Sequence, residues 1–229
     1  MTNTQKKTKK HSKKHSKILL KKTKKYVKNN NLIIHISGCS GAGKTTLGEK
    51  LLEKFSDKII VKDLDNLRSE FLKEEYKDKK MNEIKKEIWN EGKYQQWIDN
   101  YIDKNKDKPI VFVGLNNIPW VNKFSYYNMH SKHNFYINLD FDTIFKQRCS
   151  RFMDNIFVKN REKVLDNIIK NKNKEIKNIQ DMFYNNCNYD EILEINKQFN
   201  KDYKEQKYKF MSIEDIYEKV SKILNKAIK

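Results

Sequence analysis

The sequence predicts an α/β domain in which helices flank a parallel sheet, and two observations lead to this fold class. Short, mostly apolar runs typical of buried parallel strands recur along the chain, at 32–37, 59–61, 110–115, 134–139 and 208–211. Stretches with apolar residues at helical spacing lie between these runs, and a glycine-rich segment joins the first strand to the first helix. A length of 229 residues suits one such domain with appendages.

The glycine-rich segment at 38–46 reads GCSGAGKTT and matches the phosphate-binding pattern G-x-x-x-x-G-K-[ST] at every required position. The chain has six glycines, and Gly38, Gly41, Gly43 and Gly48 fall within this one stretch. Average glycine usage is about 7%, which argues against a chance match. The alternative is a glycine-rich turn between strand and helix that holds no ligand. The pattern and its flanks favour a nucleotide site.

The residue types in this segment suit ATP with Mg²⁺. Backbone N–H groups along the segment can converge on phosphate oxygens, and the helix that opens at Lys44 adds the positive end of its dipole. In such a loop Lys44 would bridge the β- and γ-phosphates, the Thr45 hydroxyl would bind Mg²⁺, and Thr46 would reach the α-phosphate. The predicted cofactor-binding residues are Gly38, Ser40, Gly41, Ala42, Gly43, Lys44, Thr45 and Thr46.

The second strand run, at 59–61, leads into Asp63, Asp65 and Arg68. Ligands of an open parallel sheet lie beyond the carboxyl ends of its strands, so these residues are placed where an acceptor substrate would meet the nucleotide. A carboxylate there could accept the proton of a substrate hydroxyl or hold Mg²⁺ through water, and Arg68 could contact the substrate. The alternative for Asp65 is the N-cap of a helix at 66–75. Two acids flanking one leucine leave room for both roles.

The middle of the chain alternates further helices and strands. A helical stretch at 81–103 has Gly92 as a possible break, and Pro109 precedes the third strand, which ends in Asn116-Asn117 where an acid commonly positions magnesium. Residues 116–132 resemble a loop with short helical pieces. After the fourth strand, Asp140 or Asp142 should cap a helix.

That helix carries Arg148 and Arg151, which share one face because they lie three residues apart. The pair could neutralise the charge of a transferring phosphate, or it could be solvated helix charge. Residues 157–205 are helical and strongly polar, as in a mobile lid or an external helical pair. Ser212 with Asp215 resembles a cap for a closing helix that runs to about Ala227.

The N-terminal part of the chain is unusually basic. Residues 1–28 hold twelve lysines and no acid, so they account for most of the net charge of +19. We expect a disordered tail at 1–30 and a separate domain at 31–229. The tail could serve nuclear import or make weak, non-specific contacts with nucleic acid through residues 1–28, or it could simply be solvated.

Cysteine usage and hydropathy bear on where the protein resides. Cys39, Cys149 and Cys187 are scattered without a C-x-x-C pair, which gives no disulfide framework or zinc site and suits a reducing compartment. No apolar run approaches the roughly 20 residues of a membrane span, and the N-terminus lacks an apolar signal core. We therefore expect an intracellular protein, cytoplasmic or nuclear, that is neither secreted nor transmembrane.

The chain resembles the nucleoside, nucleotide and small-metabolite kinases among the P-loop NTPases. The resemblance rests on 38–46, on Asp63-Leu64-Asp65, which looks like the Asp-x-Asp of shikimate- and gluconate-kinase-like enzymes, and on 147–151, which looks like the start of an arginine-bearing lid. It extends loosely over 32–225 and implies a five-stranded parallel sheet in the order 2-3-1-4-5 with a helical lid-like insertion at about 150–205. The Asn116-Asn117 pair departs from the family pattern.

By this resemblance, Asp65 is the base or acceptor ligand, Asp63 binds magnesium-bound water, and Arg148 and Arg151 are lid arginines. Lys44 completes the expected catalytic set. The expected function is transfer of the ATP γ-phosphate to a small-molecule acceptor, a nucleoside or nucleotide. The alternatives are a nucleic-acid 5′-end kinase, an ATP-hydrolysing nucleic-acid-binding factor without a small-molecule acceptor, and a pseudo-kinase, against which the intact Lys44 and Thr45 argue.

Overall fold

The computed structural model describes residues 31–77, 92–117 and 126–228 of the chain. Contacts divide the chain into Met1–Asn31 and Leu32–Lys229, and the sheet and its helices belong to the second unit. The expected tail at 1–30, residues 81–91 of the helical stretch at 81–103, and residues 118–125 of the loop at 116–132 lie outside the described residues.

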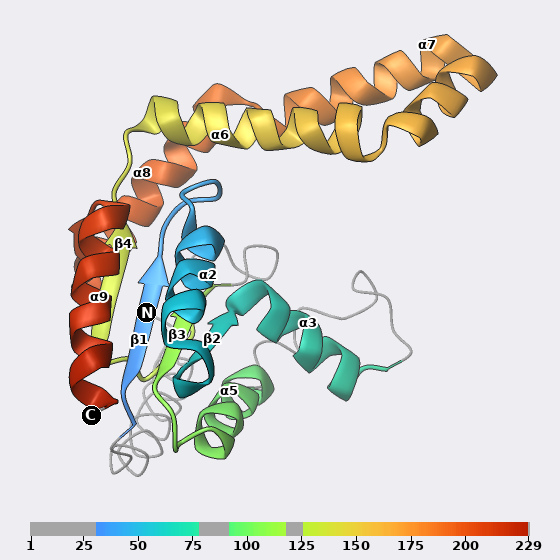
Figure 1. The fold of residues 1–229 in the computed structure, drawn as a ribbon. Coiled ribbons are helices and arrows are strands. Elements are labelled where there is room, and N and C mark those ends of the chain that lie inside the picture. Colours follow the sequence, from blue (N-terminus) through green and yellow to red (C-terminus); the bar gives the residue numbers. More distant parts are fainter. Residues whose placement is uncertain (1–30, 78–91, 118–125, 229) are drawn as a thin grey trace, which may run out of the picture. The chain divides into compact units, whose positions relative to one another are not determined.

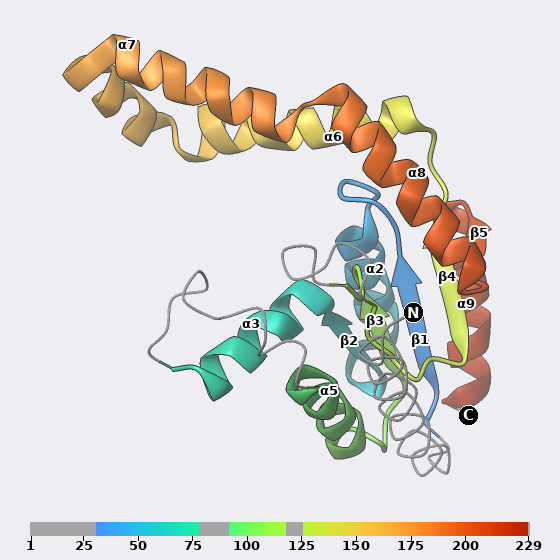
Figure 2. The same ribbon diagram turned by 180° about the vertical axis from the view of Figure 1, so that it is seen from behind.

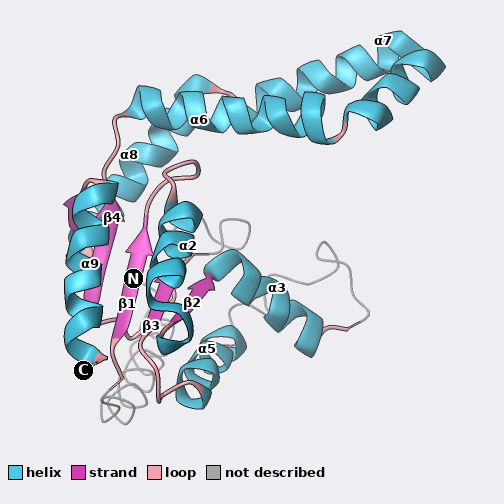
Figure 3. Ribbon diagram, viewed as in Figure 1, coloured by secondary structure: helices cyan, strands magenta, loops and turns pink. Residues whose placement is uncertain are grey.

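Within the described residues, five strands form one parallel sheet in the order β2-β3-β1-β4-β5 (Figures 1 and 3). The predicted five-stranded parallel sheet and its order are confirmed, and each strand falls on one of the apolar runs in the sequence. The strands are β1 (Ile33–Ser37), β2 (Ile60–Asp63), β3 (Ile110–Val113), β4 (His133–Ile137) and β5 (Lys209–Met211).

The central strand β1 is buried along its whole length. It pairs with β3 on one side and β4 on the other, so that Ile36 lies opposite both Val113 and Phe135. A strand covered on both faces has no solvent-facing side, which explains why its sequence lacks strict polar alternation. The polar residues His35 and Ser37 are therefore also fully buried.

Two layers of helices cover the sheet (Figures 1 and 2). On one face, α2 (Lys44–Phe55) and α9 (Ile213–Ala227) pack Leu47, Leu51, Ile216 and Val220 against apolar residues of β1, β3 and β4. On the other face, α3 (Leu64–Glu75) and α5 (Lys93–Lys104) enclose Ile110 and Phe112. Beside them on that face, α8 (Tyr189–Glu205) packs Phe199 and Tyr203 against Tyr136 of β4.

Helix α2 approaches the sheet closely at Gly48. A Cβ atom added there would lie 3.0 Å from Val61 Cγ1 and 3.3 Å from Val113 Cγ1. Both distances are short for real Cβ contacts, so glycine is what permits this spacing. Helix α2 ends in the short 3₁₀ helix η1 (Ser56–Lys58).

The polar stretch after β4 is helical, as predicted. It consists of α6 (Phe141–Asp154), the π-helix η3 (Asn155–Lys159), α7 (Arg161–Asn186) and then α8. Asn171 has φ −159° and ψ 86° inside α7, so this helix is two helical pieces joined at a kink. The predicted lid role of this region stays a prediction.

Three caps can be compared with the sequence predictions. Asp140 caps α6 and Ser212 caps α9, each accepting a backbone N–H three residues on, as predicted. The alternative role of Asp65, as the cap of a helix at 66–75, is excluded, because α3 begins at Leu64, whose buried side chain belongs to the core. The cap is therefore Asp63, whose Oδ1 accepts the N–H of Asp65 at 2.8 Å.

No helix within the described ranges is long and apolar enough to cross a membrane.

Candidate functional site

The loop between β1 and α2 turns sharply and then opens the helix. Gly41 and Gly43 have φ of +92° and +82°, a region that L-side chains rarely adopt, and the N–H of Ala42 bonds to the carbonyl of Cys39 at 3.1 Å. Gly43 occupies the N-cap position of α2, and no described side chain caps this helix. The first helical bond runs from Leu47 N to Gly43 O, so the N–H groups before Leu47 point out of the helix end. Such an end suits an anion.

A cavity of about 290 Å³ lies in front of this loop, at the carboxyl ends of β1, β2 and β3. From the predicted phosphate-binding segment it is lined by Ser40, Gly41, Gly43, Lys44, Thr45 and Thr46. From the predicted acceptor, metal and lid residues it is lined by Asp63, Asp65, Arg68 and Arg151. The structure thus brings together, around one cavity, residues that are separated by more than a hundred positions in the sequence.

Three predicted site residues are not among the described residues that line this cavity. The Gly38 carbonyl accepts a hydrogen bond from Lys44, and Ala42 is buried in the core between the sheet and α2. Arg148 lies on α6, where its Nε donates to the carbonyl of Asn186 at 2.8 Å. Of the two predicted lid arginines, the one that lines the cavity is Arg151, one turn further along α6.

Lys44 is held where its charge is partly desolvated. Its Nζ donates to the carbonyl oxygens of Gly38 and Cys39, at 2.7 Å each. Burial lowers the pKa of Lys44 to about 8, while the Cys39 side chain and the carboxylates of Asp65 and Asp63 oppose that shift. An ammonium group in this position gains much from an approaching phosphate, because two neutral carbonyls replace only part of its hydration.

Thr45 and Asp63 place two oxygen ligands side by side. Thr45 Oγ1 donates to Asp63 Oδ2 at 3.2 Å, and both residues line the cavity. Hydroxyl and carboxylate oxygens are ligands that Mg²⁺ prefers, so the pair fits this metal. The part of the chain that the structure describes holds no group of three or more His, Cys, Asp or Glu residues able to bind a metal. Phosphate and water oxygens would have to complete the coordination of Mg²⁺ here.

Asp65 projects into solvent at the cavity, and Arg68 fixes its position. The Asp65 side chain is 77% exposed, whereas Arg68 is almost fully buried. One guanidinium nitrogen of Arg68 pairs with Asp65 Oδ1 and another donates to the carbonyl of Asn117. Arg68 was predicted as a substrate contact, and the structure adds a positioning role toward Asp65.

The segment after β3 supplies cavity residues that sequence reasoning did not assign. Gly114, Leu115 and Asn117 line the cavity, although the sequence marked Asn116-Asn117 only as a departure from the family pattern. Asn116 is buried and faces the other way: its Oδ1 accepts from Tyr203 OH and its Nδ2 donates to the carbonyl of Tyr127, both at 2.8 Å. These partners lie far along the chain, so no local signal in the sequence could reveal them.

His35 forms a buried polar link behind the cavity wall. Its Nε2 lies 3.0 Å from the carbonyl of Gly114 and its Nδ1 lies 2.5 Å from Tyr208 OH. Because a carbonyl only accepts, Nε2 carries the proton and Nδ1 accepts from the tyrosine. Burial lowers the pKa of His35 to about 4, against the opposing effect of the Gly114 bond, and the nearby charge of Lys44 lowers it further. His35 is therefore neutral at physiological pH.

No protein-family model matches this chain, and no curated protein matches it at a significant level.

Proposed function

We propose that this chain is an ATP-dependent, Mg²⁺-requiring kinase of the P-loop NTPase class that transfers the γ-phosphate to a small-molecule acceptor, a nucleoside or nucleotide. One observation carries the proposal. A single cavity is bordered by the loop at 38–46, by the oxygen pair Thr45–Asp63 and by the Asp65–Arg68 pair. These are the three kinds of group that phosphoryl transfer needs, for the phosphates, for the metal and for the acceptor.

Each group has a role in this proposal. The N–H groups at the start of α2 and the Lys44 ammonium bind the nucleotide phosphates. Thr45 and Asp63 hold Mg²⁺, which when bound neutralises phosphate charge. Asp65 accepts the proton of the acceptor hydroxyl, and Arg68 keeps its carboxylate at the cavity. Arg151 adds a positive charge from the opposite element, α6.

The wall of the cavity beyond Arg68 is filled by aromatic side chains. Behind Arg68 and Asn117 lie Tyr94 and Tyr127, whose rings pack edge to face with 4.9 Å between their centroids. Among the described residues this packing leaves no space that a water molecule could occupy, so an acceptor would lie in the cavity itself, beside Asp65 and Arg68. The choice of a nucleoside or nucleotide acceptor follows the family resemblance, and a panel of acceptors tests it.

The test is ADP release with a panel of acceptors, supported by one variant and its control. Purified protein with ATP and Mg²⁺ is given nucleosides, nucleotides, sugars or oligonucleotides, and acceptor-dependent ADP release identifies a kinase. Lys44→Ala should lower turnover by about 10² or more, because the ammonium group that faces the transferring phosphate is lost. Lys50→Ala is the control, since Lys50 is an exposed lysine of the same helix. Lys44→Ala activity within a few-fold of the wild type would overturn the proposal.

The lysines of residues 1–28 favour one second candidate, a nucleic-acid 5′-end kinase. The same panel separates the two candidates. Release of ADP that depends on a 5′-hydroxyl oligonucleotide and on no small molecule would select the second. ATP hydrolysis stimulated by nucleic acid without phosphate transfer would instead identify an ATP-hydrolysing binding factor.

A further inference from the structure

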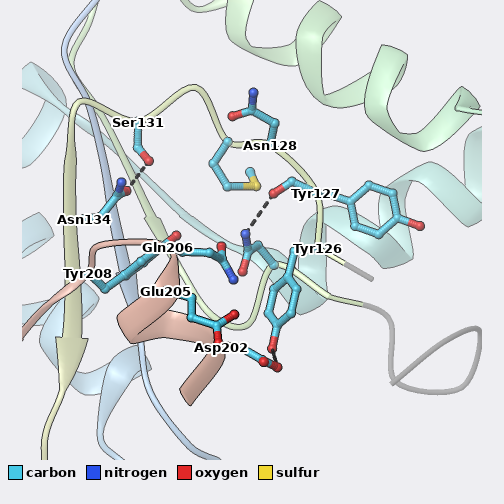
Figure 4. Close-up of a pocket in the computed structure, with 11 residues that line it drawn as sticks. Tyr126, Tyr127, Asn128, Ser131, Asn134, Asp202, Glu205, Gln206 and Tyr208 are labelled. Atoms are coloured by element: carbon cyan, nitrogen blue, oxygen red, sulfur yellow. Dashed lines mark hydrogen bonds between the residues drawn. The ribbon is translucent and has the colours of Figure 1, made fainter. Parts of the chain in front are cut away.

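A second and larger cavity, of about 640 Å³, lies on the sheet face covered by α8 (Figure 4). Small-molecule sites in proteins occupy about 300–1,000 Å³, so the volume suits a small ligand. The segment after β3 separates it from the candidate catalytic cavity. Asn116 lines the larger cavity, whereas Gly114, Leu115 and Asn117 line the catalytic one.

The polar side chains around this cavity are held in place before any ligand arrives. Asp202 accepts from Tyr126 OH through Oδ2 and from Gln198 Nε2 through Oδ1, both at 2.7 Å. Ser131 Oγ donates to Asn134 Oδ1. In Figure 4, Asp202, Glu205 and Tyr126 lie together on one side of the cavity, with Ser131 and Asn134 away from them on the other. Groups fixed by such bonds lose little freedom when they bind a ligand.

The charge of the lining is opposite to the charge of the protein. Lysine and arginine make up 49 of the 229 residues, yet the eleven described residues that line this cavity include neither. The charged residues among them are Asp202 and Glu205, which lie three apart on α8 and so share one face. In a chain of net charge +19, a cavity whose charged lining residues are both carboxylates favours cations over anions.

The remaining lining side chains indicate which kind of cation fits. Tyr126 and Tyr208 contribute aromatic surface, and aromatic rings attract ammonium groups. The Tyr127 ring points away from the cavity and packs on Tyr94 (Figure 4). A bare metal ion suits the cavity poorly, because the described residues hold no cluster of three or more His, Cys, Asp or Glu. Amide and hydroxyl groups of Asn134, Gln206 and Ser131 can satisfy further N–H groups of an extended amine.

We propose that this cavity binds a small organic cation of the primary-amine or polyamine class, through the carboxylates of Asp202 and Glu205 and the faces of the neighbouring tyrosines. The site lies outside the candidate catalytic cavity and needs neither ATP nor Mg²⁺. Its test is therefore independent of the proposed kinase activity.

Calorimetric titration of the full chain with spermidine, without nucleotide, tests the proposal. The wild type should bind saturably, with one molecule per chain. The variant carrying both Asp202→Asn and Glu205→Gln should bind about tenfold more weakly or not at all, because both carboxylates are lost. Triethylene glycol, a neutral molecule of similar length, should not bind. Glu194→Gln is the matched control, since Glu194 is an exposed acid of the same helix that pairs with Lys197.

Asp202 has structural bonds, so the melting temperature of the double variant is measured first. If that variant is unfolded, Glu205→Gln alone decides the outcome, because Glu205 is an exposed residue; its affinity should fall about two- to fivefold. Any one of three results would overturn the proposal. These are no saturable binding of spermidine to the wild type, wild-type affinity for spermidine in the folded charge variants, and binding of triethylene glycol as strong as that of spermidine.

Discussion

Lys44 stands in an environment that disfavours its charge, and this has a measurable consequence. Burial lowers its pKa to about 8, so the free protein loses the ammonium charge as the pH rises through that value. Bound phosphate stabilises the charged form and raises the pKa again. We predict that ATP binding takes up a proton at about pH 8.5 and that ATP affinity falls as the pH rises above about 8.

Calorimetry in two buffers of different ionisation enthalpy measures this proton uptake. Lys44→Met keeps the length of the side chain without a titratable group, and its ATP binding should take up no proton in this range. Equal uptake by the variant and the wild type would assign the proton to another group.

Substitution of Asp65 can distinguish a catalytic role from a structural one, because the cap of α3 is Asp63 and not Asp65. We predict that Asp65→Asn lowers acceptor-dependent turnover by about 10²–10⁴, the usual contribution of general-base catalysis. ATP affinity should barely change, since the loop at 38–46 is untouched. The melting temperature should fall only modestly, because the asparagine Oδ1 can still accept a hydrogen bond from Arg68, which is itself buried.

Asp63→Asn is the companion variant. Asparagine caps a helix about as well as aspartate, so α3 should be retained while the Mg²⁺ dependence of turnover changes. Turnover, ATP affinity and melting temperature are measured for both variants. Full activity in Asp65→Asn would remove Asp65 from the mechanism and leave the Asp65–Arg68 pair as a structural contact.

Some of these residue positions follow from local sequence and others do not. The loop at 38–46 was predictable because glycines and a lysine at fixed spacing determine the local backbone. Asp63 and Asp65 could be placed at the cavity because they follow a strand. The bond from Arg68 to the Asn117 carbonyl joins residues 49 positions apart, and it depends on how α3 packs against the segment after β3. Such a contact has no signature in either segment alone.

At the scale of an element, β1 carries an imidazole into a fully buried strand. The pKa of His35 falls from 6.5 to about 4 on folding, so between these values the unfolded chain binds more protons than the folded one. The contribution of His35 to the free energy of unfolding is fully present above about pH 6.5. It decreases as the pH falls toward about 4, and the total loss is about 3 kcal/mol. Urea unfolding at about pH 7 and about pH 4.5 measures the loss.

His35→Gln provides the comparison for β1. Glutamine keeps a donor and an acceptor but does not titrate, so the stability of the variant should depend less on pH across this range. Its absolute stability is expected to be lower, because the amide does not reproduce both the Tyr208 and the Gly114 bonds. An unchanged difference between the two pH values would show that other groups cause the acid sensitivity.

The elements themselves were largely predictable, and their boundaries less so. All five strands could be located from apolar runs. The strands β1 and β3 are buried along their whole length, and a strand buried on both faces can contain few polar residues, whereas the edge strands β2 and β5 are less buried. Ser212 was predictable as a cap, and the cap of α6 was narrowed to Asp140 or Asp142, from their position before an apolar helical pattern. The alternative of a cap at Asp65 fails because the start of α3 depends on burying Leu64, which is a property of the packed core. The kink at Asn171 gives no clear signal in a run of lysine and asparagine.

At the scale of the whole molecule, most of the net positive charge lies outside the part of the sequence that supplies the described lining residues of the candidate catalytic cavity. Residues 1–28 hold twelve lysines, whereas the described residues that line the cavity all lie between 40 and 151. We predict that deletion of residues 1–28 leaves turnover on a small acceptor unchanged. Non-specific affinity for nucleic acid should fall, and its dependence on salt should flatten as phosphate contacts are lost.

Two measurements check this deletion: steady-state turnover on the acceptor found by the panel, and nucleic-acid binding at several salt concentrations. Replacement of the twelve lysines by glutamine is the control for length, and it should reproduce the binding defect. Loss of small-molecule turnover on deletion would show that residues 1–28 belong to the catalytic unit and that the predicted domain boundary at 30/31 is wrong.

The close approach at Gly48 means that the catalytic geometry is sensitive to a position that touches no substrate. Because α2 begins with Lys44 and Thr45, the spacing between this helix and the sheet sets how far both side chains stand from the carboxylate of Asp63 on β2. A methyl group at Gly48 would require the side chains of Val61 and Val113, or α2 itself, to move by a few tenths of an ångström. Wherever α2 moves, Lys44 and Thr45 move with it, so a substitution at Gly48 is expected to lower turnover through the placement of these two side chains, although Gly48 touches no substrate.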